Sequence, residues 1–576
     1  MIKPVYLMAV LLAVTAPSSV VFAQTPVPGA GDILRSTKEK PESPTQGAPV
    51  LPDVKQADER PAMSLGEDIK ITVNAFTVSG NTAIDSATIV AALAEDIGKE
   101  LDAGGLANAA RKARRVYTSR GYFLAVAYLP QQEIKSGVVE IAIIEGRLGE
   151  IKVSVAPGAG ITESQARAII DAHLKSGDLI TEAALERPLL LIRDMAGVDA
   201  KSTIDPGQQV GTADISVAVV PDQSGRQVSG RVDLDNNGNR FAGEHRIGAS
   251  VLVSSPLGLG DRLSLRAQIA EQVKTNVASA NYVLPVGPFG TKVALSAAQL
   301  YYTLGQNEFA GLGAHGDAAI YGFNVIHPVF RRRDANVFVR LGYEETSTRD
   351  FLKVTLAPDR KKIPATTLEV SGDLFDSNKG YTFGSLTYVE GRTKFLNATN
   401  LAVDQNSGKT SGGFSKVAWS IKRLQQLPAD FFLELAASGQ VASKNLTPLM
   451  KFSLGGPTGV RAYPVGDASG DNGELYSLEL RRVVPGVTLL GNAITGSVFY
   501  DAGRVEQNAN LNDIPAAVPR NKQGRGGYGF GLSGGNRDTL LMRLSVAWPD
   551  AATPAADQND KAKRDPRAYF SVLKAF

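Results

Sequence analysis

The last eight residues, Tyr569–Phe576, constrain the fold of this chain more than any other segment. They have the composition of a short β-strand, and that strand ends on an aromatic residue, Phe576. At the other end, residues 1–23 combine a basic start, an apolar run from Val5 to Val14 and the cleavage-site pattern Val21-Phe22-Ala23, which predicts a signal peptide. We therefore expect a secreted outer-membrane β-barrel that closes its last strand against its first, because lipid does not tolerate an open sheet edge.

Composition excludes several other classes of protein. No run of about 18 apolar residues lies downstream of the N-terminus, which excludes membrane-spanning helices. The absence of Cys excludes disulfides and thiolate metal sites. The 61 basic and 58 acidic residues leave a net charge of only +3, so charge does not favour a nucleic-acid partner. A mean hydropathy of −0.06 is compatible with a barrel, whose strands alternate lipid-facing and lumen-facing side chains.

The part of the mature chain before the barrel is a linker followed by an internal repeat. Residues 24–70 are rich in Pro, Ser, Lys and Glu, which predicts a linker, interrupted by one short helix at Gly31–Glu39. In 71–147 the pattern is strand, helix, helix, strand, strand, at Ile71–Val78, Ile84–Leu93, Leu106–Arg120, Phe123–Leu129 and Val138–Ile144. The order recurs in 148–221, at Ile151–Val155, Glu163–Leu174, Glu182–Arg193, Val198–Ile204 and Ala213–Val220. Two copies of a small α+β unit indicate modular binding domains.

Residues 222–576 show strand alternation in place of helical spacing. In Arg262–Ile269 and in Leu540–Trp548, apolar side chains occupy one face and polar side chains the other. Several apolar faces end in Tyr or Trp, as the aromatic girdles of a membrane barrel do. About 350 residues, at about 22 residues per strand with its share of turn and loop, predict about 16 strands. The alternative is a soluble β-sandwich, which would need a second apolar layer that this pattern does not supply.

Two motif matches in this region are expected to mislead. Gly531-Leu532-Ser533-Gly534-Gly535 fits the nucleophile-elbow pattern, but a strand follows it where the elbow needs a helix. Asp233–Gly238 with Glu244 fits an EF-hand loop, but strands flank it where helices are required, so we expect a hairpin turn. The four His residues show no ligand spacing. We therefore expect no catalytic residue, no metal site and no enzymatic activity.

One pair of segments suggests a functional site. A Gly-rich segment, Leu454–Tyr463, contains Arg461, and the strand Ser497–Gly503 contains Asp501 about 40 residues later. Phe499 and Asp501 share one strand face, which must be the lumen face because a charge is unfavourable in lipid. We expect Arg461, on an in-folded loop, to form a bidentate ion pair with Asp501. The alternative is two separate solvated charges.

These residues also carry a resemblance to a known family. Val460-Arg461-Ala462-Tyr463 resembles the V-R-G-[YF] motif of two-partner secretion transporters, the haemolysin secretion/activation proteins, and Phe499-Tyr500-Asp501-Ala502-Gly503 resembles their F-x-D-x-G motif. The α+β units resemble POTRA domains, the first through Val78-Ser79-Gly80-Asn81, Gly121-Tyr122, Leu129-Pro130-Gln131 and Glu145-Gly146. Two departures are Ala462 in place of the usual Gly, and Lys574 within the apolar last strand.

The resemblance implies two periplasmic POTRA domains feeding a 16-stranded barrel in the bacterial outer membrane. It implies a lumen loop carrying Val460, Arg461, Ala462 and Tyr463, a barrel-wall partner motif of Phe499, Asp501 and Gly503, and a plug formed by the helix at Gly31–Glu39. The implied partners are a secreted passenger protein with an N-terminal secretion domain, outer-membrane lipid, and the barrel-assembly machinery, which would read the terminal Phe576. No cofactor, nucleotide or nucleic acid is implied.

Recognition of the passenger would use strand addition to a POTRA sheet. The last strand of the second unit is the candidate edge, with Ala213, Ile215, Val217 and Val219 as its alternate residues. No ATP motif is present, so progressive folding of the passenger outside the cell would supply the driving force. The alternatives are an outer-membrane protein insertase of the same superfamily, a diffusion porin, and a secreted hydrolase.

Overall fold

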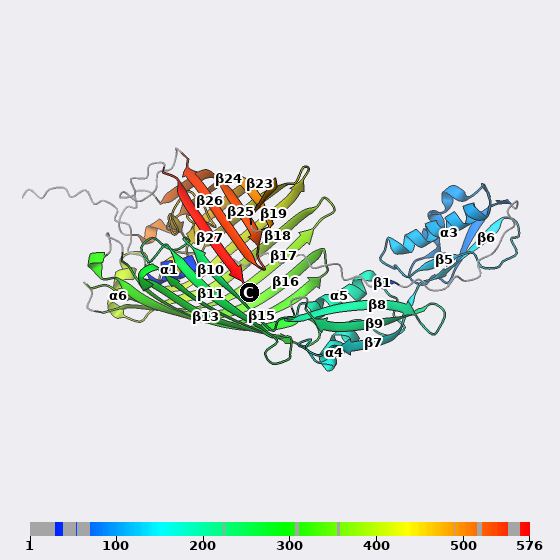
Figure 1. The fold of residues 1–576 in the computed structure, drawn as a ribbon, viewed down its shortest axis with the longest axis horizontal. Coiled ribbons are helices and arrows are strands. Elements are labelled where there is room, and N and C mark those ends of the chain that lie inside the picture. Colours follow the sequence, from blue (N-terminus) through cyan, green and yellow to red (C-terminus); the bar gives the residue numbers. More distant parts are fainter. Residues whose placement is uncertain are drawn as a thin grey trace, which may run out of the picture.

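The structure, a computed structural model, describes residues 29–37, 53–54, 70–222, 225–305, 310–353, 357–489, 491–514, 521–550 and 565–576. Figure 1 shows the β-barrel at one end of the molecule and the two α+β units in a row beside it. The second unit lies between the barrel and the first unit. The predicted signal peptide, 1–23, and most of the linker, 24–70, lie outside the described residues. Among the described helices, none has the length and apolar character needed to cross a membrane.

The first α+β unit has a three-stranded sheet in the order β3–β6–β5. Its elements are β2 (Ile71–Thr72), β3 (Ala75–Ser79), α2 (Ser86–Ala91), β4 (Glu100–Leu101), α3 (Ala103–Thr118), β5 (Val126–Tyr128) and β6 (Val138–Ile144). Asp85 and Asp102 accept hydrogen bonds from the backbone at the first turn of α2 and α3. The helix predicted from Leu106 therefore begins earlier, because Asp102 is an effective N-cap.

A buried carboxylate ties the start of this unit to its end. Glu145, directly after β6, accepts hydrogen bonds from the backbone N–H of Ala83 at 2.7 Å and from the Tyr117 hydroxyl at 2.8 Å. Burial raises the pKa of Tyr117. Burial would also raise the pKa of Glu145, but the hydrogen bonds to Ala83 and Thr82 outweigh it and hold that pKa below its usual range. Glu145 thus stays ionised and joins three elements of the unit.

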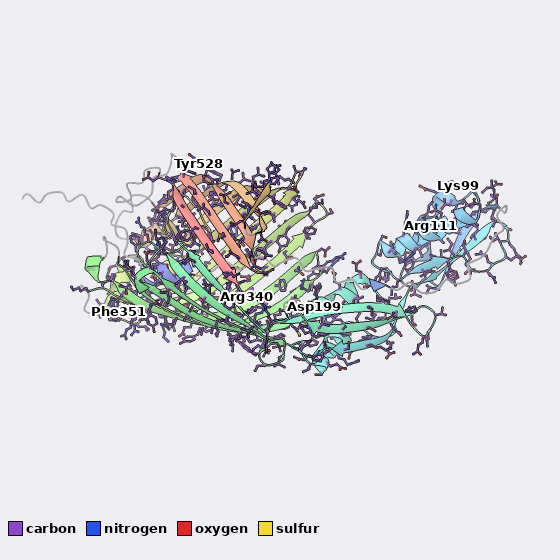
Figure 2. The ribbon with its side chains drawn as sticks, in the orientation of Figure 1. Lys99, Arg111, Asp199, Arg340, Phe351 and Tyr528 are labelled. Carbon is purple, nitrogen blue, oxygen red and sulfur yellow. The ribbon has the colours of Figure 1, made fainter. Side chains whose placement is uncertain are left out.

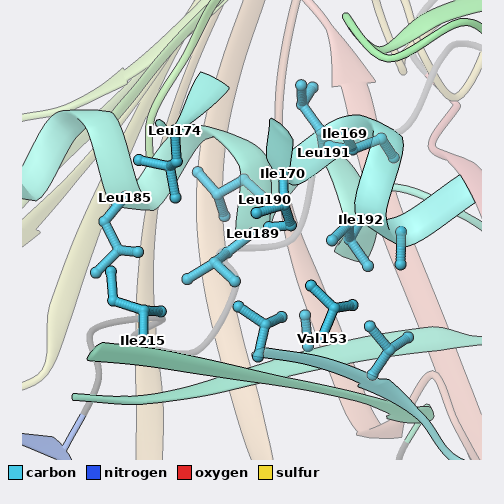
Figure 3. Close-up of a cluster of buried hydrophobic side chains, with 14 of the residues drawn as sticks. Val153, Ile169, Ile170, Leu174, Leu185, Leu189, Leu190, Leu191, Ile192 and Ile215 are labelled. Carbon is cyan, nitrogen blue, oxygen red and sulfur yellow. The ribbon is translucent and has the colours of Figure 1, made fainter. Parts of the chain in front are cut away.

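The second unit repeats the arrangement with a larger sheet. Its elements are β7 (Arg147–Val155), α4 (Glu163–His173), α5 (Glu182–Arg193), β8 (Val198–Pro206) and β9 (Thr212–Pro221). The helix predicted at Glu182–Arg193 is observed with those bounds. Figure 3 shows why the unit is stable: Ile170 of α4 and Leu189 of α5 lie between the helices and the sheet, over Val153 and Ile215. The apolar faces of α4 and α5 thus pack with the sheet into one core.

The prediction that the last strand of this unit is a sheet edge is wrong. The sheet order is β1–β8–β9–β7, where β1 (Asp53–Val54) belongs to the linker. Strand β9 is therefore central: it pairs parallel with β7 and antiparallel with β8. Its alternate side chains form the core of the unit, each at most 8% exposed: Ala213, Ile215, Val217 and Val219. A strand with a continuous buried face gains most at the centre of a sheet, which its position as the last strand in the sequence did not reveal.

Residues 228–575 form one closed antiparallel barrel, as predicted, and sixteen strands are described in it. The strands are β10 (Val228–Asp235), β11 (Arg246–Ser254), β12 (Arg262–Ala270), β13 (Thr275–Val286), β14 (Thr291–Thr303), β15 (His315–Arg331), β16 (Ala335–Phe351), β17 (Asp359–Phe375), β18 (Gly380–Phe395), β19 (Gly412–Leu427), β20 (Phe431–Ala442), β23 (Asn472–Leu489), β24 (Asn492–Glu506), β25 (Lys522–Asn536), β26 (Leu540–Pro549) and β27 (Arg567–Ala575). Each strand pairs with its neighbours in sequence, and β27 pairs with β10 to close the ring.

Side-chain alternation sets the two faces of the wall. Leu265 and Ile269 of β12 are 43% and 45% exposed on the outer face, whereas Gln268 between them is 6% exposed. The nucleophile-elbow match lies within strand β25 and continues into a hairpin with β26. The EF-hand match lies at the β10–β11 hairpin, where Asp235 pairs with Arg246 at 2.8 Å. Neither match has the helix that its chemistry requires.

The second unit is fixed directly to the periplasmic turns of the barrel. Arg331, at the end of β15, forms a bidentate ion pair with Asp194, which follows α5, at 2.9 Å and 2.8 Å. Lys292 of β14 donates to the backbone oxygen of Asp194 at 2.8 Å. Bidentate pairs of this kind hold orientation as well as distance. The turn-facing end of the barrel is therefore the end that carries the α+β units.

Candidate functional site

The candidate site is a loop that folds back into the barrel between β20 and β23. Its base is a two-stranded ladder of β21 (Phe452–Ser453) and β22 (Ser469–Gly470). Leu454, Val460 and Tyr463 are at most 1% exposed, and they pack against lumen-facing residues of the barrel wall. A side chain at Gly459 would place Cβ 1.9 Å from the Leu454 carbonyl oxygen, so this reverse turn requires glycine. We refer to residues 451–471 as the lumen loop.

The predicted Arg461–Asp501 pair is present at the tip of the lumen loop. Arg461 Nε lies 2.8 Å from Asp501 Oδ2, and Nη2 lies 3.0 Å from Oδ1, which is the bidentate geometry. The backbone N–H of Arg461 also donates to Asp501, at 3.1 Å. Asp501 is 1% exposed, and it additionally accepts a hydrogen bond from Ser477 at 2.7 Å. The contact is therefore a fully engaged, desolvated ion pair rather than two solvated charges.

Two further contacts complete the environment of the guanidinium. Glu479 of β23 accepts from Arg461 Nη1 at 2.7 Å, and its other oxygen accepts from Arg481 at 2.9 Å. The ring of Phe499 lies under the guanidinium, with the Arg461 Cζ 3.3 Å from its centroid. The motif contained Phe499 without its stacking role, and sequence reasoning missed Glu479 altogether. The available signal was register: Glu479 pairs directly with Phe499 across the β23–β24 ladder, on the same lumen face.

The remaining predicted site residues shape the seat of the loop. A Cβ at Gly503 would lie 2.6 Å from Leu454 Cδ2, so this glycine leaves room for the loop. The Ala462 methyl is accommodated by another glycine, since a Cβ at Gly527 of β25 would lie 2.4 Å from it. The Tyr463 carbonyl accepts from the Tyr569 hydroxyl at 2.7 Å, which connects the loop to the closing strand β27. All four loop residues and all three wall residues thus meet in one place.

A second element, the helix α1 (Ala30–Thr37), also lies inside the barrel (Figure 1). Ala30, Ile33 and Leu34 are at most 3% exposed and belong to an apolar cluster with lumen-facing residues of β14 to β18. The backbone N–H of Ala30 donates to Asp350 of β16 at 2.7 Å, and Tyr302 donates to the same oxygen at 2.6 Å. The helix also contacts the short helix η4 (Pro448–Met450), which leads into the lumen loop.

The barrel seam is closed through the last residue. Phe576 exchanges backbone hydrogen bonds with Gly230, at 2.9 Å and 3.0 Å, one position beyond the β10–β27 ladder. Its ring lies over Gly230, where a Cβ would come within 2.4 Å of it. Lys574 shares the outward face with Phe576, since buried Tyr569 marks the lumen-facing positions of β27. The lumen is therefore not where Lys574 points, and its stem reaches along the outer wall.

The sheet of the second α+β unit has two edges at which a strand could be added. In the second unit, β7 is one edge, and β8 is the other, with β1 paired to it only at Thr203 and Ile204. The remaining length of β8 on that side has no strand partner among the described residues. Among those same residues, no cluster of His, Cys, Asp or Glu side chains has the composition to hold a metal ion.

Comparisons with known proteins agree with this geometry. Residues 213–531 match the family described as haemolysin secretion/activation protein ShlB/FhaC/HecB, and residues 71–146 match the ShlB-type POTRA domain. The haem/hemopexin transporter protein HuxB of Haemophilus influenzae strain 86-028NP is 26% identical, over 83% of this chain and 82% of that protein. The outer membrane transporter CdiB of Dickeya dadantii is 23% identical over 75% of this chain and 74% of that protein. The solved structure of CdiB from Escherichia coli covers 90% of this chain and 93% of its own, at 20% identity and a TM-score of 0.66.

Proposed function

The chain belongs to the haemolysin secretion/activation protein family, the two-partner secretion transporters of the outer membrane, and we propose that it exports one large partner protein through the barrel lumen. The main support for a route through the barrel is that its lumen is filled by two elements of the chain itself. A barrel of this size encloses an aqueous channel unless something fills it. Here α1 and the lumen loop fill it, and both are held to the barrel wall by non-covalent side-chain contacts, which can break and re-form.

The family match favours this function over the alternatives. HuxB is named as a haem/hemopexin transporter and CdiB as an outer membrane transporter, so relatives over most of the chain length are transporters rather than hydrolases. We propose for this chain a secreted passenger with an N-terminal secretion domain, and no enzymatic step. Export would need no cofactor or nucleotide, because folding of the passenger outside the cell would prevent its return.

Passenger recognition is assigned to the POTRA sheets. Strand β9 is excluded by its central position, and we place recognition on the outer edge of β8 in the second unit. Strand addition needs a row of unpaired backbone groups, and on that side β8 pairs with β1 only at Thr203 and Ile204. The docking of the second unit through Asp194 and Arg331 would hold this edge at the barrel entrance. An extended passenger segment would therefore be delivered next to the lumen.

Opening of the lumen for the passenger requires both α1 and the lumen loop to move. The lumen loop is attached to the wall through Arg461, and the stacked, doubly paired guanidinium fixes the position of its tip. We propose that this contact organises the loop in the resting and translocating states, so that its removal impairs export. The terminal strand with Phe576 would serve earlier, as the signal that the barrel-assembly machinery reads before β27 pairs with β10.

The test is a secretion assay with the passenger co-expressed. We expect Arg461→Ala and Asp501→Ala each to reduce secreted passenger at least about tenfold, by loss of a charge-assisted bidentate contact. Heat-modifiable migration on gels checks that the barrel has folded. The matched control is Arg266→Ala, because Arg266 forms a similar bidentate lumen pair with Asp233, at 2.7 Å and 2.9 Å, that does not touch the lumen loop. Normal secretion by both loop variants, or equal loss in the control, would contradict the proposal.

A further inference from the structure

The outer wall of the barrel carries a group of basic side chains on two neighbouring strands. Arg360 and Lys362 of β17, and Arg392 and Lys394 of β18, are all exposed, and we call them the basic ladder. They share the outward face with the lipid-facing Leu368 and Tyr388, which are 47% and 43% exposed. The alternate positions of the same strands face the lumen, where Ile363 and Val389 are buried against the apolar cluster around α1.

The basic ladder is arranged unfavourably for the protein alone. Lys362 and Lys394 are direct partners across the β17–β18 ladder. Like charges that face one another across strands are destabilising. Lys362 has a carboxylate neighbour, Glu345, at 3.1 Å. In the part of the chain that the structure describes, the side chains of Arg360, Arg392 and Lys394 form no hydrogen bond or ion pair, so no protein carboxylate is paired with these three cations.

Strands β24 and β25, five strands further round the barrel, show that this arrangement is not a general property of the rim. Arg504 of β24 lies four residues beyond outward-facing Tyr500, as Arg392 lies four residues beyond Tyr388. Lys522 of β25 is the cross-strand partner of Glu506, next to Arg504 on the same face. Both cations there have a protein carboxylate: Arg504 lies 2.5 Å from Glu474, and Lys522 lies 4.0 Å from Glu506. Two walls with matched cations thus differ in whether the protein supplies the anion.

The basic ladder faces the outer leaflet. It lies at the ends of β17 and β18 that are remote from the POTRA units, on the same side as Phe351 at the end of β16 (Figure 2). Tyr388 marks the membrane interface, as outward Tyr residues do. With a rise of about 3.3 Å per residue and a strand tilt of about 45°, Arg392 and Lys394 lie about 9–14 Å above it. A phospholipid headgroup layer is only about 5–7 Å thick, so these cations extend beyond the phosphate of an ordinary phospholipid.

We propose that the basic ladder is a binding site for a phosphorylated saccharide lipid of the outer leaflet, the chemical class to which lipopolysaccharide belongs. Its sugar-linked phosphates reach the height of the ladder, where Arg360 and Arg392 supply guanidinium forks and Lys362 and Lys394 supply point charges. Its acyl chains lie against the apolar outer face below, which includes Leu368 and Tyr388. The site goes beyond the export function and depends only on the outer-membrane location.

The test measures binding of lipopolysaccharide to the full-length chain in detergent. We expect the double variant Arg392→Gln with Lys394→Gln to bind about tenfold more weakly than the unaltered chain, since each basic residue near an anionic membrane surface contributes substantially to binding. The matched control is Arg504→Gln with Lys522→Gln, which removes two cations at similar positions and should leave affinity within about twofold. Neither double variant removes a buried contact, and heat-modifiable migration confirms that both fold.

Three comparison ligands identify what is bound. Lipopolysaccharide stripped of its phosphates should bind the unaltered chain about as weakly as intact lipopolysaccharide binds the ladder variant. Phosphatidylglycerol and inorganic phosphate should bind weakly and without distinction between the variants. Equal losses in both double variants, unchanged affinity in the ladder variant, or phosphatidylglycerol binding as tight and as sensitive as that of lipopolysaccharide would each overturn the proposal.

Discussion

The lumen loop and α1 fill the same channel but are held by different forces. The loop is held by charge: Arg461 pairs with Asp501 and Glu479, and Arg525 of the wall pairs with Asp467 of the loop at 2.5 Å. Helix α1 is held mainly by apolar contact, with Ile33 at 1% exposure, and Asp350 of the wall accepts a hydrogen bond from its N-terminus. Charged contacts are strongly directional and leave unpaired buried charges when they break, whereas apolar contacts lose stability in proportion to area.

The two elements also differ in how they are connected to the rest of the chain. The lumen loop continues into β20 at one end and β23 at the other, so it can shift but not leave. Helix α1 is followed by the linker, and that linker reaches the second POTRA unit at β1. We infer that α1 leaves the lumen as a unit first, and that the loop rearranges afterwards. Leu449 of η4 would sense the departure, because it packs where a Cβ on Gly31 would come within 2.9 Å of its backbone nitrogen.

The largest effect is expected from breaking the charged element. Arg461→Ala leaves Asp501 and Glu479 buried without their shared cation, and removing one partner of a buried pair costs about 3–5 kcal/mol. Asp501→Ala should cost less, about 3 kcal/mol, because Glu479 still pairs with Arg461. Urea unfolding of the full-length chain in lipid vesicles gives both free energies. The double variant should be more stable than the sum of the single changes predicts, by at least about 1 kcal/mol.

Additive losses in that double-mutant cycle would mean that Arg461 and Asp501 act independently, against the bidentate geometry. The matched cycle is Arg266→Ala with Asp233→Ala, a lumen pair of the same kind that does not hold the loop. It should change stability but leave single-channel conductance unaltered. Any change in conductance therefore separates an effect on the loop from an effect on the barrel wall.

A smaller effect on stability, but a larger one on conductance, is expected from releasing the apolar element. Ile33→Asp places a carboxylate in an apolar cluster and should displace α1 by about 3 kcal/mol. Removal of residues 24–68 takes the helix away altogether. In planar bilayers both changes should raise single-channel conductance, while leaving urea stability of the barrel within about 1 kcal/mol. Conductance equal to that of the unaltered chain after removal of 24–68 would show that α1 does not obstruct the pore.

Sequence patterns predicted the parts of the fold that follow from the periodicity of apolar residues and from the residues at the chain ends. Alternation over residues 222–576 and the terminal Phe576 predicted the closed barrel with its strand number, and the helical repeat predicted both α+β units. The Arg461–Asp501 contact was predicted from a lumen-facing Asp and an Arg on a Gly-rich segment, together with the resemblance to the two family motifs, and the ion pair is present.

What escaped prediction depends on pairing between distant strands. The edge assigned to Ala213–Val220 was wrong because β9 pairs with β7 on one side and β8 on the other, and neighbouring segments do not encode that order. Glu479 became part of the site only through its register opposite Phe499. The linker strand β1 pairs with β8 about 150 residues away, and its two residues are too few to show any periodic pattern. Contacts of this type require the three-dimensional register.

The smallest effect is expected at the hydrogen bond between the N-terminus of α1 and Asp350. Asp350→Ala removes the acceptor for the Ala30 N–H, and loss of such a cap costs about 1 kcal/mol, or about a fivefold shift in occupancy. Single-channel records should therefore show open events about fivefold more often, with the open conductance seen after removal of 24–68. The control is Asp317→Ala, a carboxylate on the outer face of the neighbouring strand, paired with Arg349 at 2.8 Å. If Asp350→Ala opened the channel as fully as Ile33→Asp, the carboxylate rather than apolar packing would hold α1, and the contrast with the lumen loop would fail.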